Sequence, residues 1–276
     1  NQLEVEVNDI RSDIGFKYYG FDAHTVSGGA GFTYQEIFNI KDKRNFIRGS
    51  NGVLMPASSL IDTRELGVLP AAFDKGRLNY FGYIQEEWRF ANDWTLTTGV
   101  RVDKYRGFNV AVNPKASLVW NITPSLTAKL LYGRAFRVPT FLESTEGEWL
   151  ISKGNPALQP ETIDTGEVGL IERWNSYQIT RLNAYYYETK DFVSIVFDSA
   201  VGVPTFRNAR GSRGYGFEAE HEMVVTPSLK VRMNYAFQKA EAKTNDTPSG
   251  RTPEHQAYFE TEWQFLPAWY LDLSMK

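Results

Sequence analysis

Apolar and aromatic side chains fill every odd position of the stretch Leu229-Lys230-Val231-Arg232-Met233-Asn234-Tyr235-Ala236-Phe237-Gln238. The even positions hold Lys, Arg, Asn, Ala and Gln, and a period of two is that of a β-strand with one apolar and one polar face. The same phase recurs in residues 96–103, 126–132, 181–186 and 269–275. These stretches are about the 9 to 11 residues that a tilted strand needs to cross a bilayer. The alternation predicts an all-β fold, a transmembrane antiparallel β-barrel that is apolar outside and polar inside.

The composition excludes several other classes of protein. The chain has 276 residues, is 42% hydrophobic with a mean hydropathy of -0.39, and has no run that approaches 18 apolar residues, which excludes a helical membrane protein. A barrel is compatible with these values because its lipid-facing and lumen-facing residues cancel in the average. A net charge of -3 gives no basic field, so no nucleic-acid partner is expected. The absence of Cys excludes disulfides and thiolate metal sites.

Six of the seven tryptophans lie within about five residues of a short polar turn and on the apolar face of an alternating strand. They are Trp88, Trp94, Trp120, Trp174, Trp263 and Trp269. Indole rings prefer the headgroup level of a membrane, so these residues mark one rim of the predicted barrel. The seventh, Trp149, stands in a long loop at the other rim.

The connections between the predicted strands alternate in length. Short turns lie near 91–93, 121–125, 174–177, 225–228 and 266–268, and longer polar loops occupy roughly 38–76, 137–161, 198–208 and 242–253. Short periplasmic turns and long extracellular loops are typical of outer-membrane barrels. About twelve strands are predicted, at residues 2–10, 28–37, 77–90, 94–106, 111–121, 125–136, 162–174, 177–190, 191–224 (divided by a loop), 228–241, 254–265 and 269–276. The last still alternates at Lys276, and because an unpaired edge is not viable in lipid, we expect a piece of a longer barrel.

Two residues break the alternation. Glu86 and His221 fall on the lipid face by parity, each about five residues from a short turn. Placement at the membrane interface, or a β-bulge that turns the side chain away, explains them. A functional role is the alternative interpretation.

Three segments carry a further pattern. Tyr83, Gln85 and Trp88 stand in Gly82-Tyr83-Ile84-Gln85-Glu86-Glu87-Trp88, and Phe136, Arg137 and Pro139 stand in Tyr132-Gly133-Arg134-Ala135-Phe136-Arg137-Val138-Pro139-Thr140-Phe141-Leu142-Glu143. Asn155, Pro156, Pro160 and Glu161 follow in Gly154-Asn155-Pro156-Ala157-Leu158-Gln159-Pro160-Glu161, and Glu167 comes shortly after them. In this order, on an alternating pattern, the three segments resemble the barrel of TonB-dependent outer-membrane receptors of the siderophore receptor type.

The resemblance implies what the protein does. Residues 1–276 would be part of a barrel of about 22 strands with a plugged lumen, while the plug, the TonB-contacting segment and the closing strands lie outside them. Such a receptor, in the outer membrane of a Gram-negative bacterium, imports a ferric siderophore or similar scarce metal chelate and is energised through TonB. It is not an enzyme and holds no cofactor of its own, since iron arrives within the ligand. The lipid bilayer and lipopolysaccharide would surround it.

Other functions remain open. One is a passive porin, another is TonB-dependent uptake of a non-iron nutrient such as cobalamin, an oligosaccharide or haem, and a third is an outer-membrane enzyme or a secretion or adhesion barrel. Haem is disfavoured because the segment between Pro139 and Asn155 contains no His, which haem receptors of this family carry there as an iron ligand.

Six residues near the long loops are candidates for ligand binding. Trp149 is a candidate for stacking on an aromatic or macrocyclic ligand, and packing of the loop on itself is the alternative. The arginines are candidates for meeting an anionic chelate, although arginine at a barrel rim also binds lipopolysaccharide phosphates or solvates a loop. The full set is Trp149, Glu148, Phe141, Arg134, Arg137 and Arg48.

Overall fold

The computed structural model describes residues 2–48, 54–65, 73–145, 152–199, 202–209, 211–242 and 253–276. Within these residues, strands make up almost the whole structure, with one short helix. The elements are β1 (Gln2–Phe21), β2 (His24–Arg48), β3 (Leu54–Asp62), β4 (Lys75–Ala91), β5 (Trp94–Tyr105), β6 (Ala111–Asn121), β7 (Leu126–Arg137), α1 (Phe141–Ser144), β8 (Glu161–Asn175), β9 (Gln178–Lys190), β10 (Phe192–Asp198), β11 (Val203–Ala209), β12 (Ser212–Thr226), β13 (Leu229–Ala242), β14 (His255–Leu266) and β15 (Trp269–Met275).

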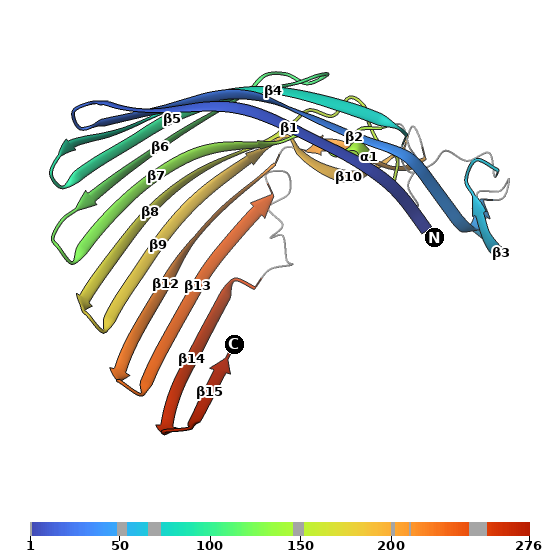
Figure 1. Cartoon of the computed structure of the whole chain (residues 1–276). Helices are drawn as coiled ribbons and strands as arrows, with labels where there is room; N and C mark the ends of the chain where they lie inside the picture. Colours follow the sequence, from blue (N-terminus) through green and yellow to red (C-terminus); the bar gives the residue numbers. More distant parts are fainter. Residues whose placement is uncertain are drawn as a thin grey trace.

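Thirteen of the described strands form one antiparallel sheet, in the order β1-β2-β4-β5-β6-β7-β8-β9-β12-β13-β14-β15, with β3 paired to β2 beside this path. Figure 1 shows the sheet curving into a wall, with the short turns along one edge and the long connections along the other. The strands pair almost entirely with their sequence neighbours, as hairpins joined by short turns do. The predicted barrel wall and the alternation of connection lengths are confirmed, including the exception predicted at 106–111, where a short connection joins β5 to β6 on the side of the long loops.

The N-terminal strands are longer than the alternation predicted. β1 and β2 have 20 and 25 residues and meet at a tight turn in which Ala23 has a φ of 59°. Alanine rarely adopts a positive φ, so the sequence does not indicate a turn at this position. The strand at residues 11–21 was therefore not predicted. The predicted loop at 38–76 is in part strand, since β2 continues to Arg48 and pairs with β3.

The predicted loop at 198–208 is wrong for most of its length, because β10 and β11 form a separate two-stranded hairpin there. The predicted strand region 191–224 therefore divides into this hairpin and β12, and only β12 joins the wall. The run Phe192–Phe197 is largely apolar without a period of two. Such a run does not reveal whether it lies in the wall or above it.

The outer face of the wall is apolar and exposed. Leu130 and Val168 are opposite each other on β7 and β8 and are 55% and 51% exposed, as lipid-facing side chains are. The girdle tryptophans share this face, and the rings of Trp94 and Trp120 stack 4.7 Å apart near the short turns. Among the described residues, no helix is both long enough and apolar enough to span a membrane.

Both residues that break the alternation have polar partners on the outer face. Glu86 Oε1 lies 2.7 Å from Nδ1 of His24, and His221 Nδ1 lies 2.9 Å from the hydroxyl of Thr180. Neither residue stands at a shift of strand register, so the bulge explanation is wrong. Hydrogen bonding to a neighbouring strand satisfies each group instead.

Candidate functional site

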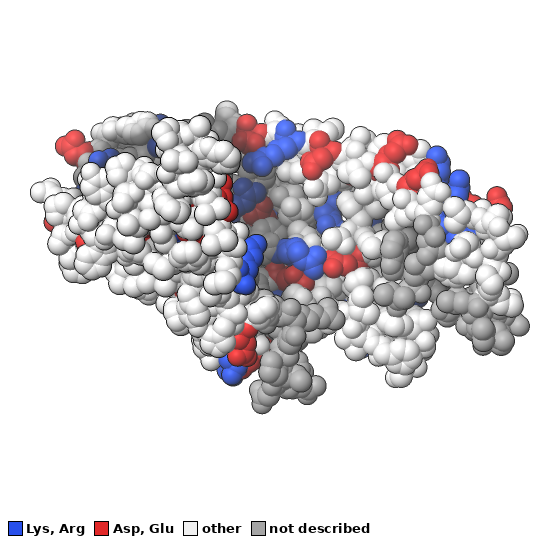
Figure 2. All heavy atoms as spheres, turned by 90° about the horizontal axis from the view of Figure 1, so that it is seen from below, with Lys and Arg blue, Asp and Glu red and all other residues white. Residues whose placement is uncertain are grey.

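The inner face of the wall is lined by paired charges of both signs. Seen from below in Figure 2, Lys and Arg lie beside Asp and Glu across the hollowed face. The Arg181 guanidinium donates to both Glu220 and Glu222, and Arg232 Nη1 lies 2.6 Å from a carboxylate oxygen of Glu260. These side chains occupy the polar phase of β9, β12, β13 and β14, as the alternation predicted.

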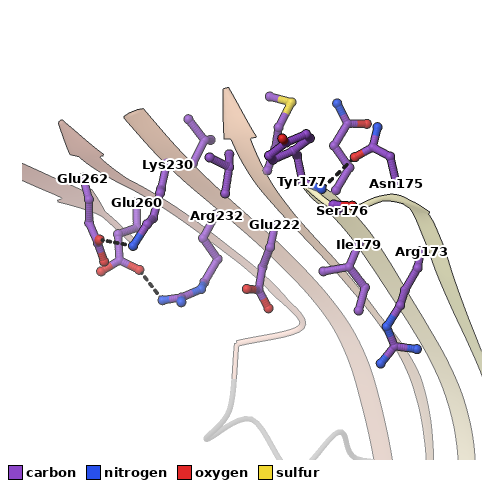
Figure 3. Close-up of a pocket in the computed structure, with 14 residues that line it drawn as sticks. Arg173, Asn175, Ser176, Tyr177, Ile179, Glu222, Lys230, Arg232, Glu260 and Glu262 are labelled. Atoms are coloured by element: carbon purple, nitrogen blue, oxygen red, sulfur yellow. Dashed lines mark hydrogen bonds and ion pairs between the residues drawn. The ribbon is translucent and has the colours of Figure 1, made fainter. Parts of the chain in front are cut away.

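A cavity of about 340 Å³ opens on this face near the short turns. Figure 3 shows Glu222, Arg232 and Glu260 side by side in it, with Ile179 of β9 between Glu222 and Arg173 of β8. Lys230 Nζ lies 3.6 Å from Glu262 and completes a second pair. Cations and carboxylates lie close together on this surface. It therefore suits contact with another polar protein surface more than passage of ions of one sign.

At the opposite rim, Arg137 joins two acidic residues. Its Nε and Nη2 donate to the two oxygens of Glu161 at 2.8 Å each, and its Nη1 donates to Glu143 at 2.8 Å. Arginine forms such paired bonds because its planar fork matches a carboxylate. Arg137 ends β7, Glu161 begins β8 and Glu143 lies on α1, so one guanidinium fixes both ends of the long loop.

The short helix α1 is held by a capping box. Thr140 accepts from the backbone N–H of Glu143 at 3.2 Å, and Glu143 accepts from the backbone N–H of Thr140 at 2.7 Å. Burial acts to raise the pKa of Glu143, but the hydrogen bonds from Arg137 and from the Thr140 backbone outweigh it and hold this pKa below its ordinary value. Glu143 is therefore a fixed anion at neutral pH.

The third motif, at residues 154–161, packs against the end of the second, at residues 132–143. The backbone N–H of Asn155 donates to the carbonyl of Glu143 at 2.7 Å, and a Cβ on Gly154 would lie 1.9 Å from the carbonyl oxygen of Thr145. Asn155 also donates to the carbonyl of Phe206 on β11 at 3.0 Å, while Leu158 is 1% exposed. These residues form a joint, here called the rim joint, between α1, the base of the loop at residues 138–160 and the β10–β11 hairpin. Their turn-forming character only partly indicated this role.

A larger cavity, of about 570 Å³, lies under this joint on the inner face, and cations and aromatic rings line it. The Arg77 guanidinium lies 4.5 Å from the Phe141 ring centroid and donates to the Ser144 hydroxyl at 3.2 Å. The Arg101 guanidinium forms two bonds with Asp103, at 2.8 and 2.7 Å. Phe141, a predicted ligand-binding residue, therefore does line a cavity together with Arg137. Arg77 was missed, although its odd position on β4 gives it the inward phase.

Arg134 lies on the other side of the sheet. It pairs with Asp164 at 2.8 Å in the register of the outer face, whereas Arg137 shares the phase of the inner residues. The two arginines therefore do not form one anion site. Trp149 and Glu148 lie outside the described residues, as does the side chain of Arg48, and their predicted ligand contacts stay predictions.

The first motif lies within the wall. Tyr83 and Gln85 belong to the inner face of β4 and Trp88 to the outer face. A Cβ on Gly29 would lie 2.9 Å from the Tyr83 ring, so glycine at this position gives the ring room to lie across β2. Tyr83 of this motif is therefore a packing residue between β4 and β2.

All three histidines of the chain are in the outer-face phase. His24 pairs with Glu86 and His221 with Thr180, and His255 Nδ1 lies 2.7 Å from the hydroxyl of Tyr235. None of the three lines the two cavities described above, whereas His255 is among the residues around a further cavity beside β13 and β14.

A curved antiparallel sheet with an apolar outer face, a charged inner face and a tryptophan rim defines the wall of a transmembrane barrel. The chain belongs to the family of TonB dependent receptor-like β-barrels, whose sequence profile matches residues 4–275. It is therefore part of a receptor rather than of an enzyme, and it lies in the outer membrane of a Gram-negative bacterium.

Similar proteins come from sequence and from solved structures. The chain is 29% identical over 202 residues to the iron-regulated outer membrane virulence protein of Vibrio cholerae serotype O1 (strain ATCC 39541 / Classical Ogawa 395 / O395), covering 66% of this chain and 31% of that protein. The siderophore receptor PirA from Pseudomonas aeruginosa has 15% identity and a TM-score of 0.74, covering 99% and 46%. A mutant of the ferric enterobactin receptor PfeA from the same species has 16% identity and a TM-score of 0.74, covering 98% and 41%. The chain thus spans about a third of the length of the curated relatives that it matches.

Proposed function

We propose that the full-length protein imports a ferric siderophore or a similar scarce metal chelate across the outer membrane, energised through TonB. The family match over residues 4–275 carries this proposal, and the name of the relative at 29% identity supports iron as the cargo. TonB would act through a segment outside these residues. Iron would arrive within the ligand, so that no resident cofactor is needed.

The inner face supports a plugged rather than an open lumen. Its paired charges of opposite sign, such as Arg181 with Glu220 and Arg232 with Glu260, give no field of one sign for selecting ions. They do offer hydrogen-bonding partners to a polar plug. The barrel wall would then enclose the plug, and movement of the plug would open a path through the lumen.

The cavity under the rim joint is the proposed place for ligand capture within the described residues. Arg77, Arg101 and Arg137 face it together with Phe141 and Tyr105. Guanidinium groups beside aromatic rings suit an anionic, aromatic metal chelate. Trp149 and Glu148 of the same long loop remain predicted ligand-binding residues.

Receptors with this fold carry more than one kind of cargo. The copper transporter OprC has 14% identity and a TM-score of 0.71, covering 95% of this chain and 41% of that protein, so receptors named for different cargoes share the fold. Uptake of cobalamin, an oligosaccharide or haem is therefore kept as an alternative. A passive porin is the alternative without energy coupling.

Uptake of radioactive iron tests the proposal. A deletion strain carrying the full-length gene, starved of iron and given a ferric siderophore, should accumulate iron, and a strain without the gene should not. Loss of uptake in a strain lacking TonB separates active transport from a porin. Iron uptake that is equal with and without the gene would overturn the assignment, and a steady single-channel conductance of the purified protein would favour the porin.

A further inference from the structure

Two parts of the inner face carry opposite net charge. The inward positions of β12, β13 and β14 hold five carboxylates and two cations, a net charge of -3. Those of β5, β6 and β7 hold four cations and one carboxylate, a net charge of +3. An anion in the lumen is therefore attracted to one side of the wall and repelled from the other. The charged residues of the cationic side are Arg101, Asp103, Lys115, Lys129 and Arg137.

The two lysines of the cationic side are available to an anion. Arg101 is held by Asp103 through two hydrogen bonds, whereas neither Lys115 nor Lys129 forms an ion pair with any residue that the structure describes. On the anionic side, by contrast, both cations of β13 are paired with glutamates of β14. The charge of Lys115 and Lys129 is therefore not neutralised within the described part of the wall.

Glycines on both sides of Lys115 leave a hollow around it. The register places Gly99 and Gly133 opposite Lys115 on the two neighbouring strands. The lysine lies across Gly99, where a Cβ would be 3.2 Å from Lys115 Cε, but a Cβ on Gly133 would meet nothing within 4 Å. Further along the same row, a Cβ on Gly214 would lie only 2.5 Å from the ring of Tyr187. A tyrosine thus fills the space over that glycine, whereas the space over Gly133 is open.

This hollow is part of a cavity of about 650 Å³ on the inner face. Its lining includes Lys115 together with Gln85, Thr97 and Thr165, which are neutral side chains that can donate hydrogen bonds. Glu167 is the one carboxylate among the described residues of the lining. A lysine beside neutral donors suits an anionic group, because both kinds of side chain can donate to its oxygen atoms.

The cations descend from the cavity under the rim joint towards the short turns. Arg101 lines that upper cavity and lies opposite Asn113, two residues before Lys115 on β6. Lys115 lies opposite Gly133, four residues beyond Lys129 on β7. At a rise of about 3.3 Å per residue, the successive steps along the strands are about 7 and about 13 Å. The cavity around Lys115 is therefore the next one below the proposed place of ligand capture on this side of the wall.

We propose that the cavity around Lys115 is a transit site for the anionic metal chelate, which enters it from the cavity under the rim joint and leaves it past Lys129. This inference rests on the proposed function. Attraction to β5–β7 and repulsion from β12–β14 would keep an anion on this side of the lumen. Because lysine is a flexible point charge rather than a bidentate clamp, it would hold the chelate loosely enough for it to move on.

The charge of Lys115 is tested in iron-starved cells that carry the full-length receptor. The probe is radioactive iron, supplied as its tris-catecholate or as its citrate chelate, both of which are anionic. Lys115→Gln should lower the maximal rate of iron uptake about tenfold, while the concentration for half-maximal binding at the cell surface stays unchanged. Lys104→Gln is the matched control, since it removes a lysine from the outer face of β5, and its uptake should be normal.

The hollow is tested separately by filling it. Gly133→Phe should lower the maximal rate of uptake in the same way, again without a change in surface binding. Gly166→Phe is the matched control, because a Cβ on Gly166 also meets nothing within 4 Å but this residue lies on the outer face of β8. Migration of unheated samples on gels reports whether each variant is folded, and the glycine pair decides the question if Lys115→Gln is not.

The outcomes separate the transit site from the proposed function. Wild-type cells that neither bind nor accumulate either chelate would overturn the proposed function, and the transit site with it. Normal uptake in a folded Lys115→Gln or Gly133→Phe variant, beside uptake by the wild type, would overturn the transit site alone. So would normal uptake combined with new sensitivity of Lys115→Gln cells to vancomycin, because it would assign Lys115 to holding the plug.

Discussion

Arg134 and Arg137 stand three residues apart on β7 and belong to opposite faces of the sheet. Arg134 pairs with Asp164 in the outer phase, and Arg137 pairs with Glu161 in the inner phase. The end of one strand therefore presents one cation to the membrane and another to the joint that holds the long loop. Similar residues in one motif have different surroundings because a strand reverses face at each step.

Replacing Arg137 should loosen the loop base. In Arg137→Ala, Glu143 and Glu161 lose their shared partner, although their side chains are only 16% and 13% exposed. Leaving partly buried acceptors without a partner costs about 1–3 kcal/mol. The amides of Thr145 and Asn155 should exchange hydrogen roughly 5 to 150 times faster, as measured by mass spectrometry of the exchanged protein.

Arg134→Ala is the control for that variant, since it removes an equivalent pair from the same strand on the other face. Exchange at Thr145 and Asn155 should stay as it was. If both variants accelerate exchange equally, the joint is not specific to Arg137.

Much of the wall was predictable from sequence, because alternation is a local property. The stretch from Leu229 to Gln238 predicted β13 and the phase of its side chains, and the tryptophans predicted which edge carries the short turns. The joint was not predictable in the same way. Glu143, Asn155 and Phe206 meet across long stretches of chain, and neither period nor turn propensity reports such contacts.

Adding a methyl group at Gly154 should disrupt the same joint by a different mechanism. A Cβ there would lie 1.9 Å from the carbonyl oxygen of Thr145, whereas a Cβ on Gly166 would meet nothing within 4 Å. Gly154→Ala should therefore make the loop base cleavable by trypsin at low enzyme concentration, and Gly166→Ala should not. Equal resistance of the two variants would show that the loop relaxes around the added group.

Acid should weaken the joint through Glu143. Its pKa is lowered in the folded protein, while an unperturbed glutamate titrates near about 4.3. A group with a lowered folded-state pKa stabilises fully above the unfolded value, and this contribution is lost as the pH falls through the folded value. The stabilisation that Glu143 contributes to the rim joint should stay constant from about pH 7 to about pH 5 and decrease below about pH 4.

A nitroxide label reports this transition, and residues 1–276 contain no cysteine that would compete for the label. Placed on Ala157→Cys in the exposed part of the loop base, the label should become more mobile only in the acid range. With Glu143→Gln added, mobility should be high at every pH. Persistence of the same acid transition in that double variant would assign it to another group.

The tryptophan rim should contribute to stability through ring contacts. Trp120 stacks on Trp94 with 4.7 Å between the centroids and 10° between the planes, and such pairs contribute about 0.5–1.5 kcal/mol beyond burial. Trp120→Ala in the full-length protein should lower the urea midpoint of unfolding in phosphatidylcholine vesicles. Trp120→Phe keeps a ring against Trp94 and should lose less. If the two variants unfold at the same urea concentration, the rings act only by occupying the interface, and the stacking itself contributes nothing measurable.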